Sequence, residues 1–288
     1  MLWRDGAVVP GTITPLDLTD RGLTLGDGLF DTALALGGRV AFEEAHIARL
    51  VTSADALGIP AAPGRIRDAL RALAGAGGRT GDRLAIRTTL TRGSGPRGLK
   101  PPDAPNPTLF ATAAASARAA AFAPLRLWPT PIARNDTSPA ARLKTLGYGD
   151  AVLAARDAAA AGFDEALFRN TRGRVACAGT GNLFALFGTT LVTPPLADGV
   201  LAGIVRAEIL ALAAGCGLRA EERSLGLPDL LGAEAVFLTN SLRLLAPVTA
   251  IGDTAFPAAA GHPAVARLVA ALRARVAQSC GVAEDVVA

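Results

Sequence analysis

The chemistry of this chain is most plainly indicated by one lysine and one tyrosine in the segment AARLKTLGYGD, residues 140–150. Lys144 is one of only two lysines among 29 basic residues, the other being Lys100, and Tyr148 is the only tyrosine. Arginine holds its proton too tightly to act as an amine nucleophile, whereas lysine can lose it and attack a carbonyl. We therefore predict a reactive amine at Lys144; the alternative is an ordinary solvated cation ahead of a helix.

Composition and charge exclude several classes of protein. Half of the 288 residues are hydrophobic and 19% are charged, so the chain can bury a large core and is not expected to be disordered. The net charge of +4 comes from scattered arginines rather than a basic run with aromatics, which favours small anionic ligands over nucleic acid. The longest uncharged stretch, residues 175–197, is broken by Gly, Asn and Pro-Pro and predicts sheet rather than a membrane helix.

The cysteines and the N-terminus favour a cytoplasmic protein. Cys177, Cys216 and Cys280 are odd in number and far apart, so neither a disulfide framework nor a metal-binding spacing is visible. The first residues, MLWRDGAVVPG, lack the apolar run of a signal peptide. With two histidines and no acid–histidine spacing, the sequence supports neither metal catalysis nor a Ser/His/Asp hydrolase.

The elements that must position Lys144 fall into two halves. The first half predicts two hairpins, LWRDGAVVPG and LFDTALALGGRVAF, separated by the glycine-rich segment DRGLTLGDGLFDT, residues 20–32, which has no helical period. The remaining elements of this half are helices at 43–58 and 64–75 and strands at 82–93 and 107–115. A small-residue segment, 117–124, is the candidate linker. The predicted domains are therefore a small α+β domain, 1–118, and a larger α/β domain, 119–288, that carries Lys144.

The second half begins with an irregular polar loop that carries Lys144. An alanine-rich helix follows at 149–161, with Asp150 as its cap and Gly162 at its end. A meander of strands comes next (EALFRN, VACAG, NLFALFG and TLVTPP), and then a loop, DGVLAG, leads into the helix IVRAEILALAAGC. A strand at 235–241 and a helix at 263–278 complete the prediction.

In this order the chain resembles the fold-type IV pyridoxal-phosphate (PLP) enzymes of the class IV aminotransferase family. These include branched-chain and D-amino-acid transaminases and 4-amino-4-deoxychorismate lyases. The resemblance covers about residues 20–253 and rests on DRGLTLGDGLFDT, AHIARL, RGSGPRG, LKTLGYGDAVLAARDAAAAGFDEAL, NLFAL, GVLAGI and FLTNSLRLLAPV, in family order. It implies a two-domain α+β fold with PLP between the domains, a homodimer and a small-molecule amino substrate.

The resemblance assigns cofactor roles to several residues. Lys144 matches the lysine that forms a Schiff base with PLP, and Tyr148 matches the tyrosine that hydrogen-bonds the phenolate oxygen. Arg49 of AHIARL matches the phosphate-binding arginine, whose forked donors suit two phosphate oxygens. Further residues match the phosphate-binding turn and the cofactor site, namely Asn182, Gly203, Ile204, Val205, Asn240 and Ser241. Relatives usually have threonine at the Val205 position, so a hydroxyl contact is lost there while the backbone N–H remains.

Cys177 is the main departure from the family pattern. Most relatives have a glutamate five residues before the position of Asn182, where it keeps the PLP pyridine nitrogen protonated. A thiol with an ordinary pKa of about 8.5 is a poor counter-ion. Transamination relies on charge delocalisation into the ring more than β-elimination does, so the cysteine favours a lyase, or else a sluggish or repurposed enzyme, unless another residue takes the glutamate's place.

The first functional hypothesis is a 4-amino-4-deoxychorismate lyase that releases pyruvate and 4-aminobenzoate, because FLTNSLRLLAPV looks more like the lyases. The alternative is a transaminase of D-amino or branched-chain amino acids with a 2-oxo acid acceptor; a third hypothesis is a catalytically silent PLP-binding protein. Arg92 and Arg97 of TRGSGPRG, together with Thr32, are candidates for substrate contact. His46 is expected to be structural. The sequence does not separate lyase from transaminase or define the substrate enantiomer.

Overall fold

The computed structural model describes residues 1–77, 83–256 and 259–288, which group into two compact units. Unit 1 contains Met1–Arg118, Leu143–Gly147 and Val276–Val287, and unit 2 contains Ala119–Arg142, Tyr148–Arg275 and Ala288. The division after Arg118 lies inside the segment chosen from the sequence as a linker. The sequence-based division gave Lys144 to the C-terminal domain, whereas the contacts of Leu143–Gly147 group it with unit 1.

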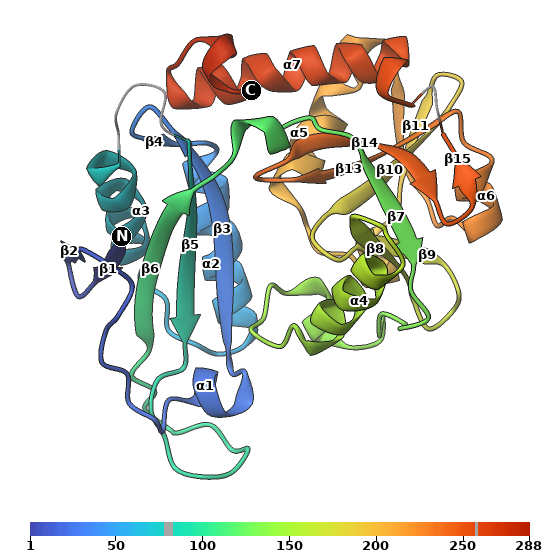
Figure 1. The fold of residues 1–288 in the computed structure, drawn as a ribbon. Helices are drawn as coiled ribbons and strands as arrows, with labels where there is room; N and C mark the ends of the chain where they lie inside the picture. The colour runs from blue at the N-terminus through green and yellow to red at the C-terminus, as the bar shows by residue number, and fades with distance from the viewer. Residues whose placement is uncertain (78–82, 257–258) are drawn as a thin grey trace. The chain divides into compact units, whose positions relative to one another are not determined.

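Unit 1 is built on a six-stranded antiparallel sheet with the strand order β2-β1-β6-β5-β3-β4. Its strands and helices, shown in Figure 1, are β1 (Leu2–Arg4), β2 (Ala7–Val9), α1 (Arg21–Leu25), β3 (Gly28–Leu36), β4 (Arg39–Val40), α2 (Glu43–Ala56), α3 (Pro63–Ala76), β5 (Arg83–Thr91) and β6 (Thr108–Ala115). Both predicted hairpins are confirmed. The turn residues Gly37 and Gly38 have φ of 55° and 80°, the left-handed backbone that tight hairpin turns require. The first residue of the strand predicted at 82–93 lies outside the described residues.

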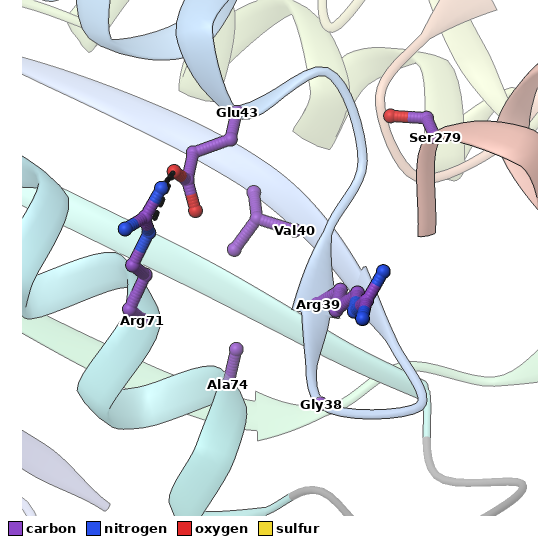
Figure 2. A pocket seen from close by; sticks show the side chains of 7 residues that line it. All are labelled: Gly38, Arg39, Val40, Glu43, Arg71, Ala74 and Ser279. Carbon is purple, nitrogen blue, oxygen red and sulfur yellow. Dashed lines mark hydrogen bonds and ion pairs between the residues drawn. The ribbon is translucent and has the colours of Figure 1, made fainter. Parts of the chain in front are cut away.

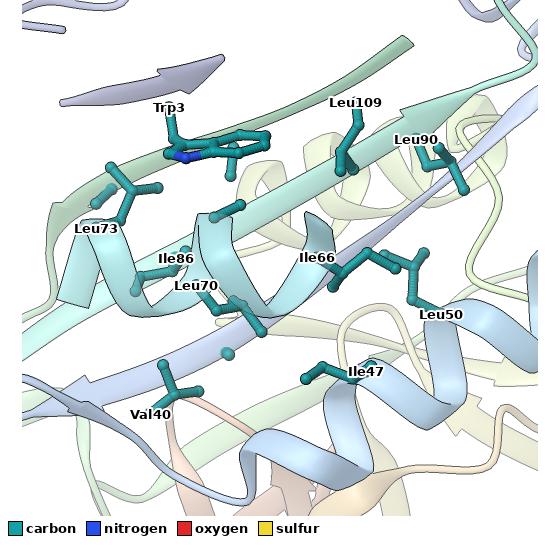
Figure 3. Packing of buried hydrophobic residues seen from close by; sticks show 14 of the residues in the cluster. Trp3, Val40, Ile47, Leu50, Ile66, Leu70, Leu73, Ile86, Leu90 and Leu109 are labelled. Atoms are coloured by element: carbon teal, nitrogen blue, oxygen red, sulfur yellow. The ribbon is translucent and has the colours of Figure 1, made fainter. Parts of the chain in front are cut away.

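Helices α2 and α3 pack on the sheet of unit 1 and bury its core, as Figure 3 shows. Both helices confirm the prediction to within two residues at each end. Ile47 and Leu50 from α2 lie in one cluster with Ile66 and Leu73 from α3 and with Ile86 from β5, and all five are almost fully buried. Apolar residues at helical spacing thus meet the alternating apolar residues of the strands.

The segment predicted to have no helical period contains a short helix, α1. Asp20 caps it by accepting a hydrogen bond from the Gly22 N–H at 2.7 Å, and Gly26 closes it with φ of 67°. Asp20 is itself fixed, because the hydroxyls of Thr91 and Thr108 donate to its other carboxylate oxygen at 2.8 and 2.9 Å. Five residues are too few for a periodic apolar pattern, which is why the sequence did not reveal this helix.

Unit 2 contains a nine-stranded mixed sheet with the order β12-β11-β10-β13-β14-β7-β8-β9, and β15 pairs with β14. Its strands are β7 (Leu125–Pro129), β8 (Glu165–Arg169), β9 (Val175–Ala178), β10 (Asn182–Phe187), β11 (Thr190–Thr193), β12 (Arg219–Glu222), β13 (Ala235–Asn240), β14 (Leu244–Ile251) and β15 (Thr254–Ala255). Its helices include α4 (Gly149–Ala160), α5 (Ile204–Leu212) and α6 (Leu227–Leu231), and α7 (Pro263–Cys280) starts in this unit. Across both units, short 3₁₀ helices occur at Arg118–Ala120, Pro139–Arg142, Leu196–Asp198, Ala214–Cys216, Ala259–Gly261 and Glu284–Val286. The four strands predicted as a meander are present as β8 to β11, but the meander itself is wrong, because β9 pairs with β8 at one edge of the sheet while β10 pairs with β11 and β13.

The start of α4 differs from the prediction. Tyr148 rather than Asp150 occupies the N-cap position, and no side chain caps the helix there. Asp150 lies in the first turn, where a carboxylate still interacts favourably with the helix dipole. None of the helices within the described part of the chain is both long enough and apolar enough to cross a bilayer.

Candidate active site

Lys144 is held against the beginning of strand β3 in unit 1. The Phe30 N–H donates to the Lys144 carbonyl at 2.9 Å, and the Leu146 N–H donates to the Gly28 carbonyl at 3.0 Å. The half-buried Lys144 side chain lies over the Phe30 ring, with Nζ 4.4 Å from the ring centroid. The two backbone hydrogen bonds to β3 fix the backbone of Lys144, and the face of the Phe30 ring attracts its ammonium group.

The close approach of the Lys144 segment depends on Gly28. A Cβ atom at residue 28 would lie 2.7 Å from the Leu90 carbonyl oxygen and 2.9 Å from a methyl carbon of Leu146. A side chain there would displace either β5 or the lysine segment. Close packing therefore explains the glycine at residue 28, because the segment that carries Lys144 pairs directly with β3.

Arg49 lies on α2 and forms a two-pronged ion pair with Asp31 of β3. Its Nε atom donates to Oδ2 at 2.8 Å and its Nη2 atom to Oδ1 at 3.0 Å. The Arg49 side chain is only 12% exposed, so it is not an ordinary solvated helix arginine. Lys144 and Arg49 thus contact consecutive residues of β3, Phe30 and Asp31. Sequence reasoning missed Asp31, and it assigned His46, the other partner of this carboxylate, only a structural role.

Arg87 is a second candidate that sequence reasoning missed. Its guanidinium carbon lies 3.6 Å from the centroid of the same Phe30 ring that Lys144 contacts. Arg87 is exposed on β5 and pairs in register with Thr32 of β3, a predicted substrate contact that is half-buried. The signal in the sequence was an arginine within the predicted strand DRLAIRTTLTRG, whereas its place opposite Thr32 comes from the structure. A cation near the lysine is suited to a substrate carboxylate.

The structure separates the two arginines that were predicted to contact substrate. Arg92 is buried, with its three guanidinium nitrogens bonded internally: Nε donates to Asp27 at 2.8 Å, Nη1 to the Gly58 carbonyl at 2.8 Å and Nη2 to the Leu57 carbonyl at 2.7 Å. This arrangement gives Arg92 a structural role instead of the predicted substrate contact. Arg97 is exposed in the loop between β5 and β6, so its predicted role stays a proposal.

In unit 2, Asn182 shapes the turn before helix α5. Its Nδ2 atom donates to the Leu201 carbonyl at 2.9 Å, and its Oδ1 atom would lie 1.9 Å from a Cβ at Gly203. Gly203 is the N-cap of α5, and no side chain caps the helix. The first N–H groups of a helix have no carbonyl partners within the helix and attract anions. Ile204 and Val205 open α5 with buried side chains, so their predicted contribution is through backbone N–H groups.

Asn240 and Ser241 lie at the end of β13. The Oδ1 atom of Asn240 accepts hydrogen bonds from the N–H groups of Leu242 at 3.0 Å and Arg243 at 2.7 Å, which orders the turn that contains Ser241. The neighbouring Thr239 is 1% exposed, and its hydroxyl has no hydrogen-bond partner among the described residues. A buried hydroxyl without a partner is costly, and a bound oxygen-rich ligand is one way to satisfy it.

Cys177 of β9 lies in an apolar cluster with residues such as Phe168 and Val200 and is 4% exposed. Burial raises the pKa of its thiol, and the charge of Glu165 raises it further, while Arg134 opposes the shift. Glu165 is a buried carboxyl whose charge acts on Cys177, so it is a candidate for the residue that takes the place of the family glutamate. It accepts a hydrogen bond from the Thr180 hydroxyl at 2.6 Å, yet burial still raises its pKa above the usual value. Tyr148, at the start of α4, is half-buried.

A cavity of about 450 Å³ also lies within unit 1, as Figure 2 shows. It is lined by Gly38, Arg39, Val40, Glu43, Arg71, Ala74 and Ser279. None of these described lining residues is a predicted site residue. Arg71 is neutralised by Glu43, whose Oε1 accepts from Nε at 2.9 Å. The cavity is therefore separate from the residues that contact β3 at Phe30 and Asp31.

Comparisons with known proteins identify the family to which the chain is similar. A family model described as "Amino-transferase class IV" matches residues 28–251. A "Putative branched-chain-amino-acid aminotransferase" of Methanocaldococcus jannaschii is 32% identical over 253 residues, 86% of each chain. The crystal structure of a 4-amino-4-deoxychorismate lyase from Pseudomonas aeruginosa has a TM-score of 0.81 and 30% identity, covering 96% of this chain and 98% of that one. That of a putative 4-amino-4-deoxychorismate lyase from Legionella pneumophila has a TM-score of 0.83 and 29% identity, covering 91% of this chain and 96% of that one.

Proposed function

Because the chain belongs to the class IV aminotransferase family, whose members depend on PLP, we propose that it binds PLP with Lys144 as the point of covalent attachment. The donor set suits that cofactor. Lys144 offers an amine on an aromatic face, and Arg49 is a buried, oriented guanidinium. The N-terminus of α5 offers backbone N–H groups, and the hydroxyl of Thr239 has no hydrogen-bond partner among the described residues. An amine, a guanidinium and helix N–H groups are the groups that an aldehyde and a phosphate require.

The roles of the proposed residues follow from their chemistry. Arg49 and the backbone N–H groups at Gly203, Ile204 and Val205 would bind the phosphate, with Asn182 holding that turn in shape. Asn240 would act by ordering the turn that presents Ser241. Tyr148 would donate its hydroxyl hydrogen to the cofactor's phenolate oxygen. Thr32 and Arg97 remain proposed substrate contacts, and Arg87 joins them as a cation on the same ring as Lys144.

PLP bound to an amine substrate makes the neighbouring C–H acidic by accepting its electrons. The residue that must move the proton is Lys144, because an uncharged lysine amine is a competent base once it no longer holds the cofactor. Phe30 keeps that amine over its ring face while the segment 144–146 is anchored on β3. Tyr148 and Arg49 would hold the reacting carbon within reach of the amine, which is an effect of orientation rather than of chemistry.

The reaction we propose is the release of pyruvate from 4-amino-4-deoxychorismate. Loss of the proton from the amine-bearing carbon and departure of the neighbouring ether oxygen make the ring aromatic, and the departing group takes up a proton to become pyruvate. The observation that carries this choice is Cys177: a buried thiol with a raised pKa stays neutral and provides no anion to keep a pyridine nitrogen protonated. Elimination depends less on a protonated pyridine nitrogen than transamination does.

A transaminase of branched-chain or D-amino acids is the second candidate. It is favoured by the identity of 32% over 253 residues with the M. jannaschii aminotransferase. Both reactions begin with removal of a proton by Lys144, so the residues that contact β3 do not separate them. The intact set of Lys144, Tyr148 and Arg49 argues against a catalytically silent PLP-binding protein.

The test is the appearance of 4-aminobenzoate, measured by its fluorescence, after the PLP-loaded protein is mixed with 4-amino-4-deoxychorismate. A rate proportional to the amount of protein, and absent from Lys144→Ala, supports the lyase. A protein that retains bound PLP but releases no 4-aminobenzoate refutes it. Formation of an amino acid from a 2-oxo acid acceptor would then identify the transaminase.

We further propose that the protein acts as a cytoplasmic homodimer on a small-molecule substrate. Its three cysteines, Cys177, Cys216 and Cys280, are all free and buried, which suits a reducing compartment. The resemblance to two-domain, dimeric relatives supports the homodimer. Light scattering of the purified protein would detect a monomer and overturn that part of the proposal.

A further inference from the structure

A carboxylate lies on the helix-covered face of strand β3. Side chains alternate along a strand, so Asp31 points to the same face as Leu29 and Ala33, which belong to the apolar core under α2 and α3. The Asp31 residue is 4% exposed. A charge taken out of water costs several kcal/mol unless it is paired and hydrogen-bonded. The burial of the Asp31 carboxylate in this core must therefore be offset by partners that pair with its charge.

Two residues of α2 neutralise Asp31. Arg49 donates from Nε and Nη2 to the two carboxylate oxygens at 2.8 and 3.0 Å, and His46 Nδ1 lies 2.6 Å from Oδ1. His46 and Arg49 are three residues apart, so they share one side of the helix. Both lie on the side that faces β3, and the His46 ring is 2% exposed.

Asp31 is ionised in this arrangement. Burial by itself raises the pKa of the carboxyl, but the charges and hydrogen bonds of His46 and Arg49 outweigh it and hold the pKa well below its usual range. An ionised carboxylate only accepts hydrogen bonds. The short contact to His46 must therefore be an Nδ1–H donating to Oδ1, which fixes the orientation of the ring.

These contacts fix the plane of the Arg49 guanidinium. A guanidinium carries five N–H donors in one plane, and Asp31 engages two of them on the Nε–Nη2 edge. The direction of the opposite edge is then set by the carboxylate, which is in turn held by His46. An arginine loses side-chain entropy when it is ordered. A ligand that meets Arg49 already ordered does not have to supply that cost on binding.

We propose that Asp31 and His46 are positioning residues that hold Arg49 ready for the phosphate group of the cofactor. This inference rests on the proposed function, in which Arg49 contacts that phosphate. Neither residue needs to touch the cofactor, because each acts through the orientation of the arginine. A merely structural ion pair would stabilise unit 1 without favouring a phosphorylated ligand over its unphosphorylated analogue.

The test compares the affinities of the apoprotein for PLP and for pyridoxal, which lacks the phosphate. Asn in place of Asp31 presents one acceptor and one donor, so it cannot receive the two-pronged bond from Arg49. We expect Asp31→Asn to lower the preference for PLP over pyridoxal by about ten- to a hundredfold, the range for losing hydrogen bonds to a charged group. The affinity for pyridoxal should change little. Asp55→Asn, on an exposed residue of the same helix, is the matched control.

Two further variants keep the test decisive if Asp31→Asn folds poorly. His46→Ala leaves the pair between Asp31 and Arg49 in place and should lower the preference less, and His46→Asn, whose amide N–H can replace Nδ1–H, should restore part of it. In an Arg49→Ala background, His46→Ala should have no further effect on the preference, because there is no arginine left to position.

The outcomes are distinguishable from failure of the proposed function. If the wild-type apoprotein binds neither ligand, the proposed function itself is wrong. If the wild type prefers PLP and the preference survives in both Asp31→Asn and His46→Ala, the positioning role is overturned. A loss of preference that appears only together with a loss of pyridoxal binding would also overturn it, because it would report a general loss of structure.

Discussion

Asn182 and Gly203 approach so closely that no side chain fits at residue 203: a Cβ there would lie 1.9 Å from the Asn182 Oδ1 atom. The asparagine is not free to turn away, because its Nδ2 atom donates to the Leu201 carbonyl at 2.9 Å. One side chain on β10 thus determines the path of the backbone into α5. If the phosphate binds at the start of α5, that turn must keep its shape.

Gly203→Ala should therefore weaken PLP binding. Overpacking costs about 1–3 kcal/mol, and here the strain falls on the proposed phosphate turn, so we expect PLP affinity to fall by about ten- to a hundredfold. Titration of the apoprotein with PLP measures it. Gly215→Ala is the matched control in the same unit, because a Cβ there meets nothing within 4 Å. Equal affinities for the two variants would show that the α5 turn does not bind the cofactor.

Lys144→Ala should abolish covalent trapping of PLP. Borohydride reduction of the loaded protein fixes the cofactor to its lysine, and intact-mass and peptide analysis locate it. The chain provides its own control, since Lys100 is the only other lysine and its side chain is 85% exposed. Lys100→Ala should trap one cofactor per chain, as the wild type does. Trapping on Lys100 in the wild type would contradict the assignment of Lys144.

Local elements were predictable because their signals are local. The hairpin around Gly37 and Gly38 follows from turn chemistry, and α2 and α3 follow from apolar residues at helical spacing. Strand β12 was not predicted because it pairs with β11 in parallel, across α5, so no hairpin turn marks it. Strand β14 was not predicted although it follows β13 through a short turn. The five-residue α1 was missed for lack of length.

The candidate site was predictable only where a family motif marked it. Lys144 and Arg49 were found, but the carboxylate that orders Arg49 was not, because Asp31 lies 18 residues earlier and is recognised only when β3 packs under α2. Arg92 was assigned to substrate because a dicarboxylic substrate needs cationic partners, and the alternative was a solvated loop arginine. Its actual partners include the carbonyls of Leu57 and Gly58, more than thirty residues away in the chain. No sequence pattern predicts such a contact with a backbone oxygen.

The two arginines of TRGSGPRG should behave differently when truncated. Arg92→Ala removes one of the two arginine partners of Asp27, the other being Arg21, and leaves the carbonyls of Leu57 and Gly58 without their donor. The free energy of unfolding should therefore fall by about 3 kcal/mol, measured by urea denaturation. Arg97→Ala removes an exposed side chain and should change that free energy by less than about 0.5 kcal/mol. If Arg97 binds a substrate carboxylate, its loss raises KM. If KM equals the wild-type value, Arg97 does not contact the substrate, and Arg87 becomes the proposed contact.

Glu165 should make the stability of the protein fall as pH rises. Its pKa is raised by burial, so the folded state binds more protons than the unfolded state between the two pKa values. The free energy of unfolding then decreases from about pH 4.3, the ordinary glutamate pKa, up to the folded pKa. Glu165→Gln keeps an acceptor for Thr180 without the charge, so its Tm should rise relative to wild type across that window. The exposed Glu284→Gln is the control; parallel Tm curves for wild type and Glu165→Gln would refute the prediction.

Cys177→Glu should raise transamination relative to elimination. A glutamate at this position would supply the anion that a neutral, buried thiol does not. In the apoprotein the same glutamate places a charge in an apolar cluster and should lower Tm. The gain in Tm on PLP binding should then be larger than in the wild type, because a protonated ring nitrogen pairs with the charge. Cys177→Ser has similar size and no charge, and it should change neither the product ratio nor the Tm gain on PLP binding. If Cys177→Glu leaves both the ratio and the Tm gain at wild-type values, Cys177 does not lie beside the ring nitrogen and the choice of the lyase loses its basis.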